Sequence, residues 1–440
     1  MGRWLRRQNT WHSPLLRSAT WMLLAALAVR FAAMGWLYRG PRPVILHEQF
    51  GAPSEVSRVA RSIASGEGFS SPLAIPTGPT AWVAPVYAYL LAGVFRVFGV
   101  YTIASAVAIR ILDSLFSALT CLPIVLLARR SFGPAVAAAA GWTWVLLPFA
   151  GETCLATLLF SVLILMATQI DDSPGLGRWV GFGLLWGLAA LTNPPLLTVL
   201  PFLVGWLGYR LGRQGVPWAR WAGVAALAFL IVVAPWFVRN YLTFGRFIPF
   251  KSVFGLELYV DNSPETDQIW REWRHPNESR SELYQMVRLG EVPYMDAKWR
   301  AVRQFIASHP GTFAWLTLKR IVYFWTGIWN VSSDYLLADP DRLVRIPALT
   351  MLTVLAFVGL RMAFRQDRAT AWLYGLVLFS APLTYYITNI TMRYRRPLQP
   401  LLVILAAYAG VEFERKRAAK SLSLDRASGK EVGRSRTSTE

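Results

Sequence analysis

Acidic side chains that could do chemistry stand just outside the apolar segments of this chain. Glu55 opens the polar stretch "EVSRVARSIA", Glu152 lies in the short stretch "PFAGETC" between two apolar runs, and Glu48 occurs in "LHEQFG". A carboxylate within hydrogen-bond reach of a hydroxyl or amine can act as a general base near neutral pH. The plainer interpretation of Glu55 is an ion pair with Arg58 and a favourable position at the start of a helix.

Basic side chains occupy comparable positions. Arg239 ends "VAPWFVR", Lys251 follows it at a short distance, and Arg393 and Arg395 occur in "TMRYRRP" before the last apolar run. Cations in such places can stabilise negative charge that develops on a bound group. Arginines at the ends of apolar segments also commonly extend toward the membrane interface without a further role, and this alternative stays open.

The composition indicates which class of protein must position these residues. The chain has 440 residues, of which 54% are hydrophobic and 16% are charged, with a mean hydropathy of +0.37. A soluble chain is about 25% charged. Repeated apolar runs long enough to cross roughly 30 Å of hydrocarbon indicate an all-α polytopic membrane protein. The net charge of +20 lies in loops between these runs, which argues against nucleic-acid binding.

Charge in the short loops predicts the topology. The positive-inside rule assigns "ARRSFG" and "YRLGRQGVPWAR" to the cytoplasm. This is consistent with about ten transmembrane helices if 81–99 and 314–330 lie at the interface instead of spanning. Both termini are then cytoplasmic, and the protein is multi-pass in the cell inner (plasma) membrane. The predicted spans are 18–38, 102–128, 134–150, 153–169, 178–193, 195–209, 218–239, 346–364, 370–389 and 397–413.

Four regions follow from this topology. Residues 1–239 form an N-terminal transmembrane module that includes a first outer loop, 39–101. Residues 240–345 form a second extracytoplasmic loop with interfacial helices. Residues 346–413 are C-terminal transmembrane helices, and 414–440 have the composition of a disordered cytoplasmic tail.

The first outer loop contains a recognisable short helix. Ser54 is a suitable N-cap, and Gly66 and Gly68 are expected to end the helix. Between them, apolar residues recur at helical spacing from Val56 to Ile63. The pattern predicts an amphipathic helix on the outer surface, with Glu55 in its first turn.

Several stretches together resemble the GT-C glycosyltransferases. They are "PSEVSRVARSIASGEGFSSP", "GPTAWVAPVYAYLLAGVFRVFG", "LTNPPLLTVLP", "PWFVRNYLTFGRF" and "MRYRRPLQPLL", in this order. The chain looks most similar to bacterial enzymes of the lipopolysaccharide galacturonosyltransferase group. It is more distantly similar to protein O-mannosyltransferases and aminoarabinose transferases. The resemblance covers most of residues 20–412 and implies a GT-C-like helical bundle.

The resemblance also implies an activity. Such enzymes move a sugar from a polyprenyl-phosphate donor to a lipid, glycan or protein acceptor on the extracytoplasmic face, usually with inversion. An acidic residue of the first outer loop acts as base, which points to Glu55 first and Glu48 second. Glu152 and Arg58 are expected to bind the acceptor or substrate.

The lipid phosphate requires a cationic site. The resemblance points to Arg239, Lys251, Arg393 and Arg395. Aminoarabinose transferases carry a lysine before a proline pair in the first loop, whereas this chain has Ala84 there, so Arg239 or Lys251 would replace it. No metal site is predicted from the scattered histidines, although some GT-C enzymes use a divalent cation.

A second class of function remains open from the sequence. A transporter or flippase for a lipid-linked or anionic solute would also have many spans and positive charge. The absence of an evident internal repeat argues against it. A scaffolding membrane protein, as a third alternative, predicts that Glu55 and Arg239 can be replaced without consequence.

Overall fold

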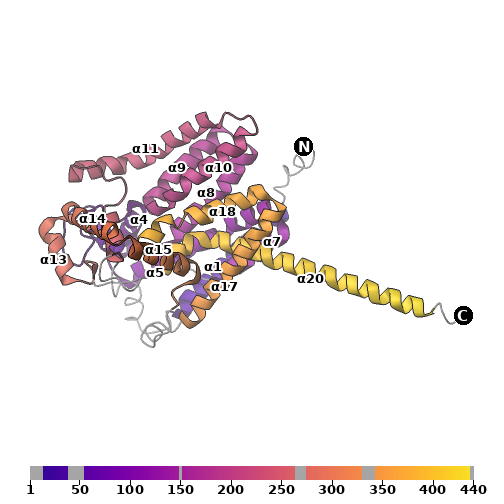
Figure 1. The fold of residues 1–440 in the computed structure, drawn as a ribbon. Helices are drawn as coiled ribbons and strands as arrows, with labels where there is room; N and C mark the ends of the chain where they lie inside the picture. Colours follow the sequence, from indigo (N-terminus) through magenta and orange to yellow (C-terminus); the bar gives the residue numbers. More distant parts are fainter. Residues whose placement is uncertain (1–12, 38–53, 148–150, 263–273, 330–341, 437–440) are drawn as a thin grey trace.

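The computed structural model describes residues 13–37, 54–147, 151–262, 274–329 and 342–436, and side chains from 18 to 421 within these ranges. Each predicted span corresponds to one helix or to two consecutive helices of an elongated bundle (Figure 1). These are α1 (Ser13–Leu37), α5 (Ile103–Leu119) with α6 (Cys121–Phe132), α7 (Pro134–Val145), α8 (Cys154–Asp172), α9 (Leu176–Thr192), η2 (Pro194–Val199) with α10 (Leu200–Gly212), α11 (Trp218–Phe244), α17 (Arg342–Gln366), α18 (Arg368–Ser380) with α19 (Leu383–Ile387), and η4 (Met392–Leu398) with α20 (Gln399–Arg436).

Length and composition support fewer spans than the sequence predicts. Among the described residues, 6 segments are long and apolar enough to cross a membrane: α1, α5–α6, α8, η2–α10, α11 and α17. The helices α7, α9 and α18 are shorter, and α20 becomes charged from Glu412 onward. That these four helices also cross the membrane, which would give ten spans, therefore stays a prediction.

Burial distinguishes the centre of the bundle from its periphery. In α8, 78% of the residues in the apolar stretch are buried inside the protein, compared with 22% in α11 and in α17. Exposed apolar side chains of α11 include Leu227, Leu230, Ile231 and Val238. A helix surface of this kind is compatible with hydrocarbon but not with water, so α11 and α17 form lipid-facing sides of the bundle.

Glycines allow two helix pairs to approach closely. A Cβ atom at Gly183 of α9 would collide with the backbone of Ala225 in α11. A Cβ atom at Gly359 of α17 would collide with the backbone of Leu405 in α20 in the same way. Small residues at such crossings provide van der Waals packing where no hydrophobic effect drives helices together.

Basic loops gather at one end of the bundle. Arg210, at the end of α10, pairs with Asp171 at the end of α8, with 2.8 Å between Nη2 and Oδ2. The neighbouring Asp172 pairs with Arg130 at the end of α6. The α6–α7, α8–α9 and α10–α11 connections therefore lie on the same side of the bundle, as the predicted order of the spans requires.

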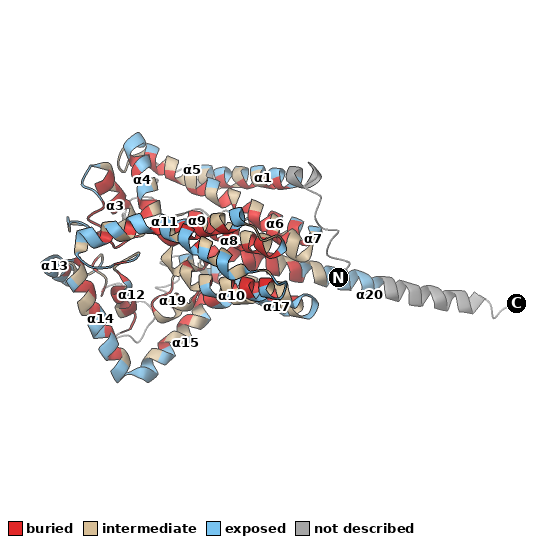
Figure 2. Ribbon diagram, turned by 90° about the horizontal axis from the view of Figure 1, so that it is seen from above, coloured by how far each residue is buried: buried red, intermediate tan, exposed pale blue. Residues whose placement is uncertain are grey.

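The remaining helices lie at the opposite end, as Figure 2 shows for α3 and α12–α14. They are α3 (Glu55–Ala64), α4 (Pro85–Phe98), α12 (Phe254–Val260), α13 (Arg280–Leu289), α14 (Glu291–Ser308) and α15 (Pro310–Thr326). Buried Glu291 joins the two outer loops. Its carboxylate accepts hydrogen bonds from Thr80 Oγ1 (2.5 Å), the Ala81 backbone N–H (2.8 Å) and Ser252 Oγ (2.7 Å).

The short helix predicted in the first loop is confirmed as α3. Ser54 caps it by accepting a hydrogen bond from the Ser57 backbone N–H, and Gly66 adopts a φ of 85° just beyond its end. The helix is more enclosed than predicted. Ser62 is fully buried, because α3 packs within this end of the bundle instead of lying on its surface.

The C-terminal segment, predicted as a tail, continues the last helix of the bundle. Where the composition indicated disorder, α20 continues as one helix to Arg436 and projects from the bundle (Figure 1).

Candidate active site

Glu55 is held at the first turn of α3 by the second outer loop. Its Oε1 accepts a hydrogen bond from Asn277 Nδ2 (2.5 Å), and Asn277 Oδ1 accepts one from Arg58 Nη1 (2.7 Å). His275 Nε2 lies 3.9 Å from the same carboxylate oxygen, and its ring packs edge-on against Trp82. The link between Glu55 and Arg58 therefore runs through Asn277. Both carboxylate and guanidinium are oriented by a residue more than two hundred positions away in sequence.

Glu152 forms an ion pair with Arg393. Their Oε1 and Nη1 atoms are 2.8 Å apart, which joins the α7–α8 loop to η4. The two side chains are 33% and 47% exposed, so water reaches both of them. Because the ion pair is accessible to water, Arg393 can release Glu152 and bind another anion at a small cost in free energy.

The charge of Arg393 is supported by several acidic neighbours. Burial among the surrounding atoms lowers the pKa of its guanidinium, but Glu152, Tyr394 and Glu55 outweigh this effect, and the pKa lies above its ordinary value. The direct partner of Arg393 is Glu152, and Glu55 adds a weaker electrostatic effect without a hydrogen bond to Arg393. We call these three predicted residues, from α3, the α7–α8 loop and η4, the electrostatic cluster.

The winding of η4 determines which arginines face this cluster. In a 3₁₀-helix, residues three apart lie on the same side. Arg396 accordingly follows Arg393 toward the α7–α8 loop, where its Nη1 donates to Thr153 Oγ1 at 3.5 Å. The sequence prediction did not include Arg396; three-residue spacing in "RYRR" is the signal that would have identified it.

Arg395, also predicted as a phosphate-binding residue, makes contacts on another side of η4. Its side chain is 1% exposed and donates to the Trp325 carbonyl (2.6 Å) and the Leu349 carbonyl (3.1 Å). These contacts join η4 to α15 and α17. Arg395 points away from Arg393, and a phosphate at the cluster would not reach it.

Arg239 also makes mainly structural contacts. It donates to the carbonyls of Phe69 (2.9 Å) and Thr80 (2.6 Å) and to Asn240 Oδ1 (2.9 Å). These bonds attach the first outer loop to the end of α11. Half-buried Lys251 precedes Ser252, which donates to Glu291. Arg239 and Lys251 therefore lie where the two outer loops contact each other.

Two remaining predictions concern Glu48 and metal binding. Glu48 lies outside the described residues. Within those residues, there is no group of three or more His, Cys, Asp or Glu side chains that could hold a metal ion.

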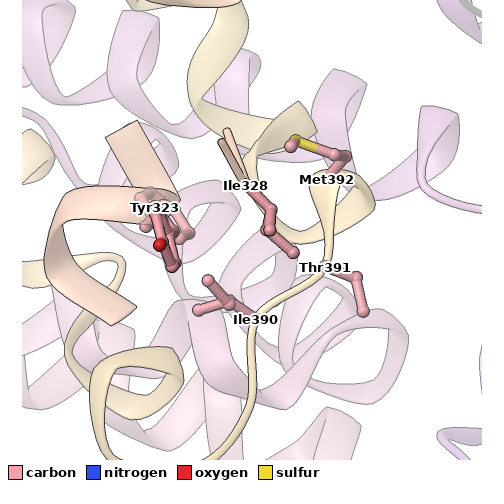
Figure 3. Close-up of a pocket in the computed structure, with 6 residues that line it drawn as sticks. Tyr323, Ile328, Ile390, Thr391 and Met392 are labelled. Atoms are coloured by element: carbon pink, nitrogen blue, oxygen red, sulfur yellow. The ribbon is translucent and has the colours of Figure 1, made fainter. Parts of the chain in front are cut away.

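An apolar hollow lies beside η4. Figure 3 shows its lining by Tyr323, Ile328, Ile390, Thr391 and Met392, from the end of α15 and the segment that enters η4. Met392 directly precedes Arg393. An apolar recess and a cation are therefore adjacent along the chain.

Comparisons with known proteins define the fold. Residues 82–238 match the sequence model of the family described as dolichyl-phosphate-mannose-protein mannosyltransferase. No curated protein matches the sequence. The structure is similar to the oligosaccharyltransferase of Archaeoglobus fulgidus in complex with zinc and sulfate, with a TM-score of 0.52 and 12% identity, over 93% of this chain and 51% of that one. The apo form of the same enzyme matches with a TM-score of 0.51 and 14% identity, over 96% of this chain and 52% of that one. ArnT from Cupriavidus metallidurans, solved with bound undecaprenyl phosphate, has a TM-score of 0.38 and 14% identity, over 86% of this chain and 77% of that one.

The protein therefore has the fold of the GT-C superfamily, as the sequence resemblance indicated. Its segment 82–238, from the first outer loop to the end of α11, is similar to the mannosyltransferase family. The chain spans about half the length of the archaeal structures that it matches.

Proposed function

We propose that this protein is a membrane glycosyltransferase that takes a sugar from a polyprenyl-phosphate donor. The observation that carries the proposal is the cluster of Glu55, Glu152 and Arg393, which combines a candidate base with an accessible cation. The acceptor is a lipid, glycan or protein hydroxyl or amine. The reaction takes place at the end of the bundle where the outer loops gather.

The proposed reaction is a single displacement. Glu55 takes the proton of the acceptor hydroxyl or amine as the acceptor atom bonds to the anomeric carbon. The bond from that carbon to the phosphate oxygen breaks, and its electron pair stays on the phosphate. The configuration at the anomeric carbon inverts, and the proton remains on Glu55.

The leaving lipid phosphate gains one negative charge, from diester to monoester. Arg393 and Arg396 are the cations suited to stabilise that charge, because both face the α7–α8 loop. The phosphate would displace Glu152 from Arg393, and Glu152 would then be available to the acceptor or the sugar. We assign Arg239 and Lys251 to holding the outer loops together, with Arg58 orienting Asn277.

Two further observations support a lipid-linked donor. The hollow next to Arg393 places apolar side chains beside the proposed position of the lipid phosphate (Figure 3). The archaeal oligosaccharyltransferase AglB, which has a similar fold, has been solved with an inhibitory peptide and a dolichol-phosphate, at a TM-score of 0.50 and 12% identity. The basic loops at the opposite end suit the cytoplasmic side of a plasma membrane, so the reaction would be extracytoplasmic.

The test is transfer of radiolabelled sugar from a polyprenyl phosphate in membranes that contain the full-length protein. Label should move to an acceptor with the wild type and be lost with Glu55→Gln, which keeps an oxygen for Asn277 but removes the charge. Glu67→Gln, an exposed residue of the same loop, is the matched control and should keep full activity. Movement of label across the bilayer without transfer would instead indicate a carrier.

A further inference from the structure

A small pocket lies next to the Glu152–Arg393 pair, with a lining surface that is mainly apolar because most polar groups around it are paired, as Trp144 Nε1 is with the Ser117 carbonyl. Its lining comes from the ends of α5 and α7, the start of α8, and the η4–α20 junction: Ser117, Trp144, Thr153, Cys154, Thr157, Arg396 and Gln399. Most of these side chains carry hydrogen-bonding groups. Polar groups at the edge of a membrane-embedded core are costly unless they are paired or serve a ligand.

One row of side chains connects this pocket with the proposed reaction site. Arg393 and Arg396 of η4 and Gln399, the first residue of α20, follow at intervals of three and therefore lie along one side. Arg393 meets Glu152 at the outer end of the row, and Arg396 meets Thr153 in the middle. Gln399 stands at the inner end, where it lines the pocket.

Gln399 has unused hydrogen-bonding capacity at this position. The side chain is 3% exposed, and its Oε1 has no hydrogen-bond partner among the described residues. Arg396 contributes a guanidinium whose bond to Thr153 Oγ1 is long, at 3.5 Å. The pocket thus offers a buried acceptor, Gln399 Oε1, and a half-buried cationic donor, Arg396, to the same small space.

The complementary ligand group must both donate and accept. A sugar hydroxyl does so, since it can donate to Gln399 Oε1 and accept from Arg396. A fully ionised phosphate only accepts, so it would leave Gln399 Oε1 unpaired unless the amide turned its Nε2 donor toward the pocket. The pocket is small and has room for one hydroxyl or hydroxymethyl group, with the rest of the ring nearer Arg393.

We propose that this pocket is the donor-specificity site and receives one hydroxyl-bearing substituent of the transferred sugar through Gln399 and Arg396. The inference rests on the proposed function, since it places the sugar of a lipid-linked donor beside the Glu152–Arg393 pair. Gln399 acts as a specificity residue in this arrangement, while Glu55 carries out the proton transfer.

The experiment compares donors that differ by one hydroxyl. Purified full-length protein is assayed with undecaprenyl-phosphate glucose, galactose and mannose, and the best donor is then replaced by each of its monodeoxy analogues. For the wild type, kcat/KM should fall about 10- to 100-fold for one particular analogue. With Gln399→Met, which keeps the size and removes the amide, the parent donor and that analogue should become equal. Gln304→Met, at an exposed position of α14, should retain the wild-type pattern.

The outcomes separate the two proposals. If the wild type transfers none of the sugars, the proposed function fails. In another outcome, the wild type transfers one sugar while Gln399→Met changes kcat/KM by the same factor for all analogues, or for none. The pocket then does not bind the sugar, and the specificity proposal is overturned. If thermal unfolding finds Gln399→Met misfolded, Gln399→Leu provides the same comparison, because it also removes the amide. Uniform values with that variant then overturn the proposal.

Discussion

Replacing Arg393 by glutamine tests whether Arg393 acts in catalysis or only stabilises the fold through its ion pair with Glu152. Both side chains are partly exposed, 47% and 33%, and an ion pair of this kind contributes only about 0.2–1 kcal/mol to stability. A preorganised donor that meets developing negative charge contributes far more to the rate, about 10²- to 10³-fold in kcat. We therefore expect Arg393→Gln to lower kcat by about two to three orders of magnitude while the free energy of unfolding changes by less than about 1 kcal/mol.

The assay is the steady-state transfer of labelled sugar, together with thermal unfolding in detergent. Arg393→Lys should lose less activity than Arg393→Gln, because it keeps the charge and loses only the fork geometry. Arg288→Gln, at an exposed position of α13, is the matched control.

The double variant Glu152→Gln/Arg393→Gln distinguishes the two roles. If Arg393 served only to neutralise Glu152, removing both charges would restore activity. If it stabilises the leaving phosphate, the double variant stays at least as slow as Arg393→Gln. A kcat that is unchanged in Arg393→Gln, or restored in the double variant, refutes the reasoning.

Three further predictions concern the outer loops and the bundle. Asn277→Ala removes the residue that orients Glu55, so kcat should fall about tenfold with little change in KM; an unchanged kcat in the transfer assay would contradict this. Burial raises the pKa of the Glu291 carboxyl, despite hydrogen bonds that favour its ionised form. Because the folded pKa exceeds the unfolded one, the wild type should gain thermal stability relative to Glu291→Gln as the pH falls toward about 4.3, and equal pH profiles would argue against it. Gly183→Ala forces α9 away from Ala225 and should cost about 1–3 kcal/mol in unfolding, whereas an unaltered melting temperature would contradict the close crossing.

Local patterns were sufficient to predict some parts of the structure. The helix that begins at Glu55 was predictable because its cap, its apolar spacing and its terminating glycines all lie within fifteen residues. The order of the apolar segments and the grouping of the basic loops follow from length and charge alone. The GT-C fold was indicated by several short stretches together.

Contacts between distant segments could not be predicted in this way. Asn277 binds Glu55 across 222 positions, and nothing in the polar stretch around it marks that partner. Arg393 and Arg395 were grouped because they are near neighbours, but the 3₁₀ winding of η4 sends them to opposite sides and pairs Arg393 with Arg396 instead. Such choices depend on backbone geometry that a single sequence does not encode locally.

A structure of the full-length protein with bound undecaprenyl phosphate would decide whether Glu55 and Arg393 share one active site. We expect the phosphate within hydrogen-bond distance of Arg393 and Arg396, Glu152 displaced from its ion pair, and the prenyl chain starting in the hollow lined by Met392. A phosphate bound at Arg239 and Lys251 instead, with the Glu152–Arg393 pair intact, would contradict this arrangement.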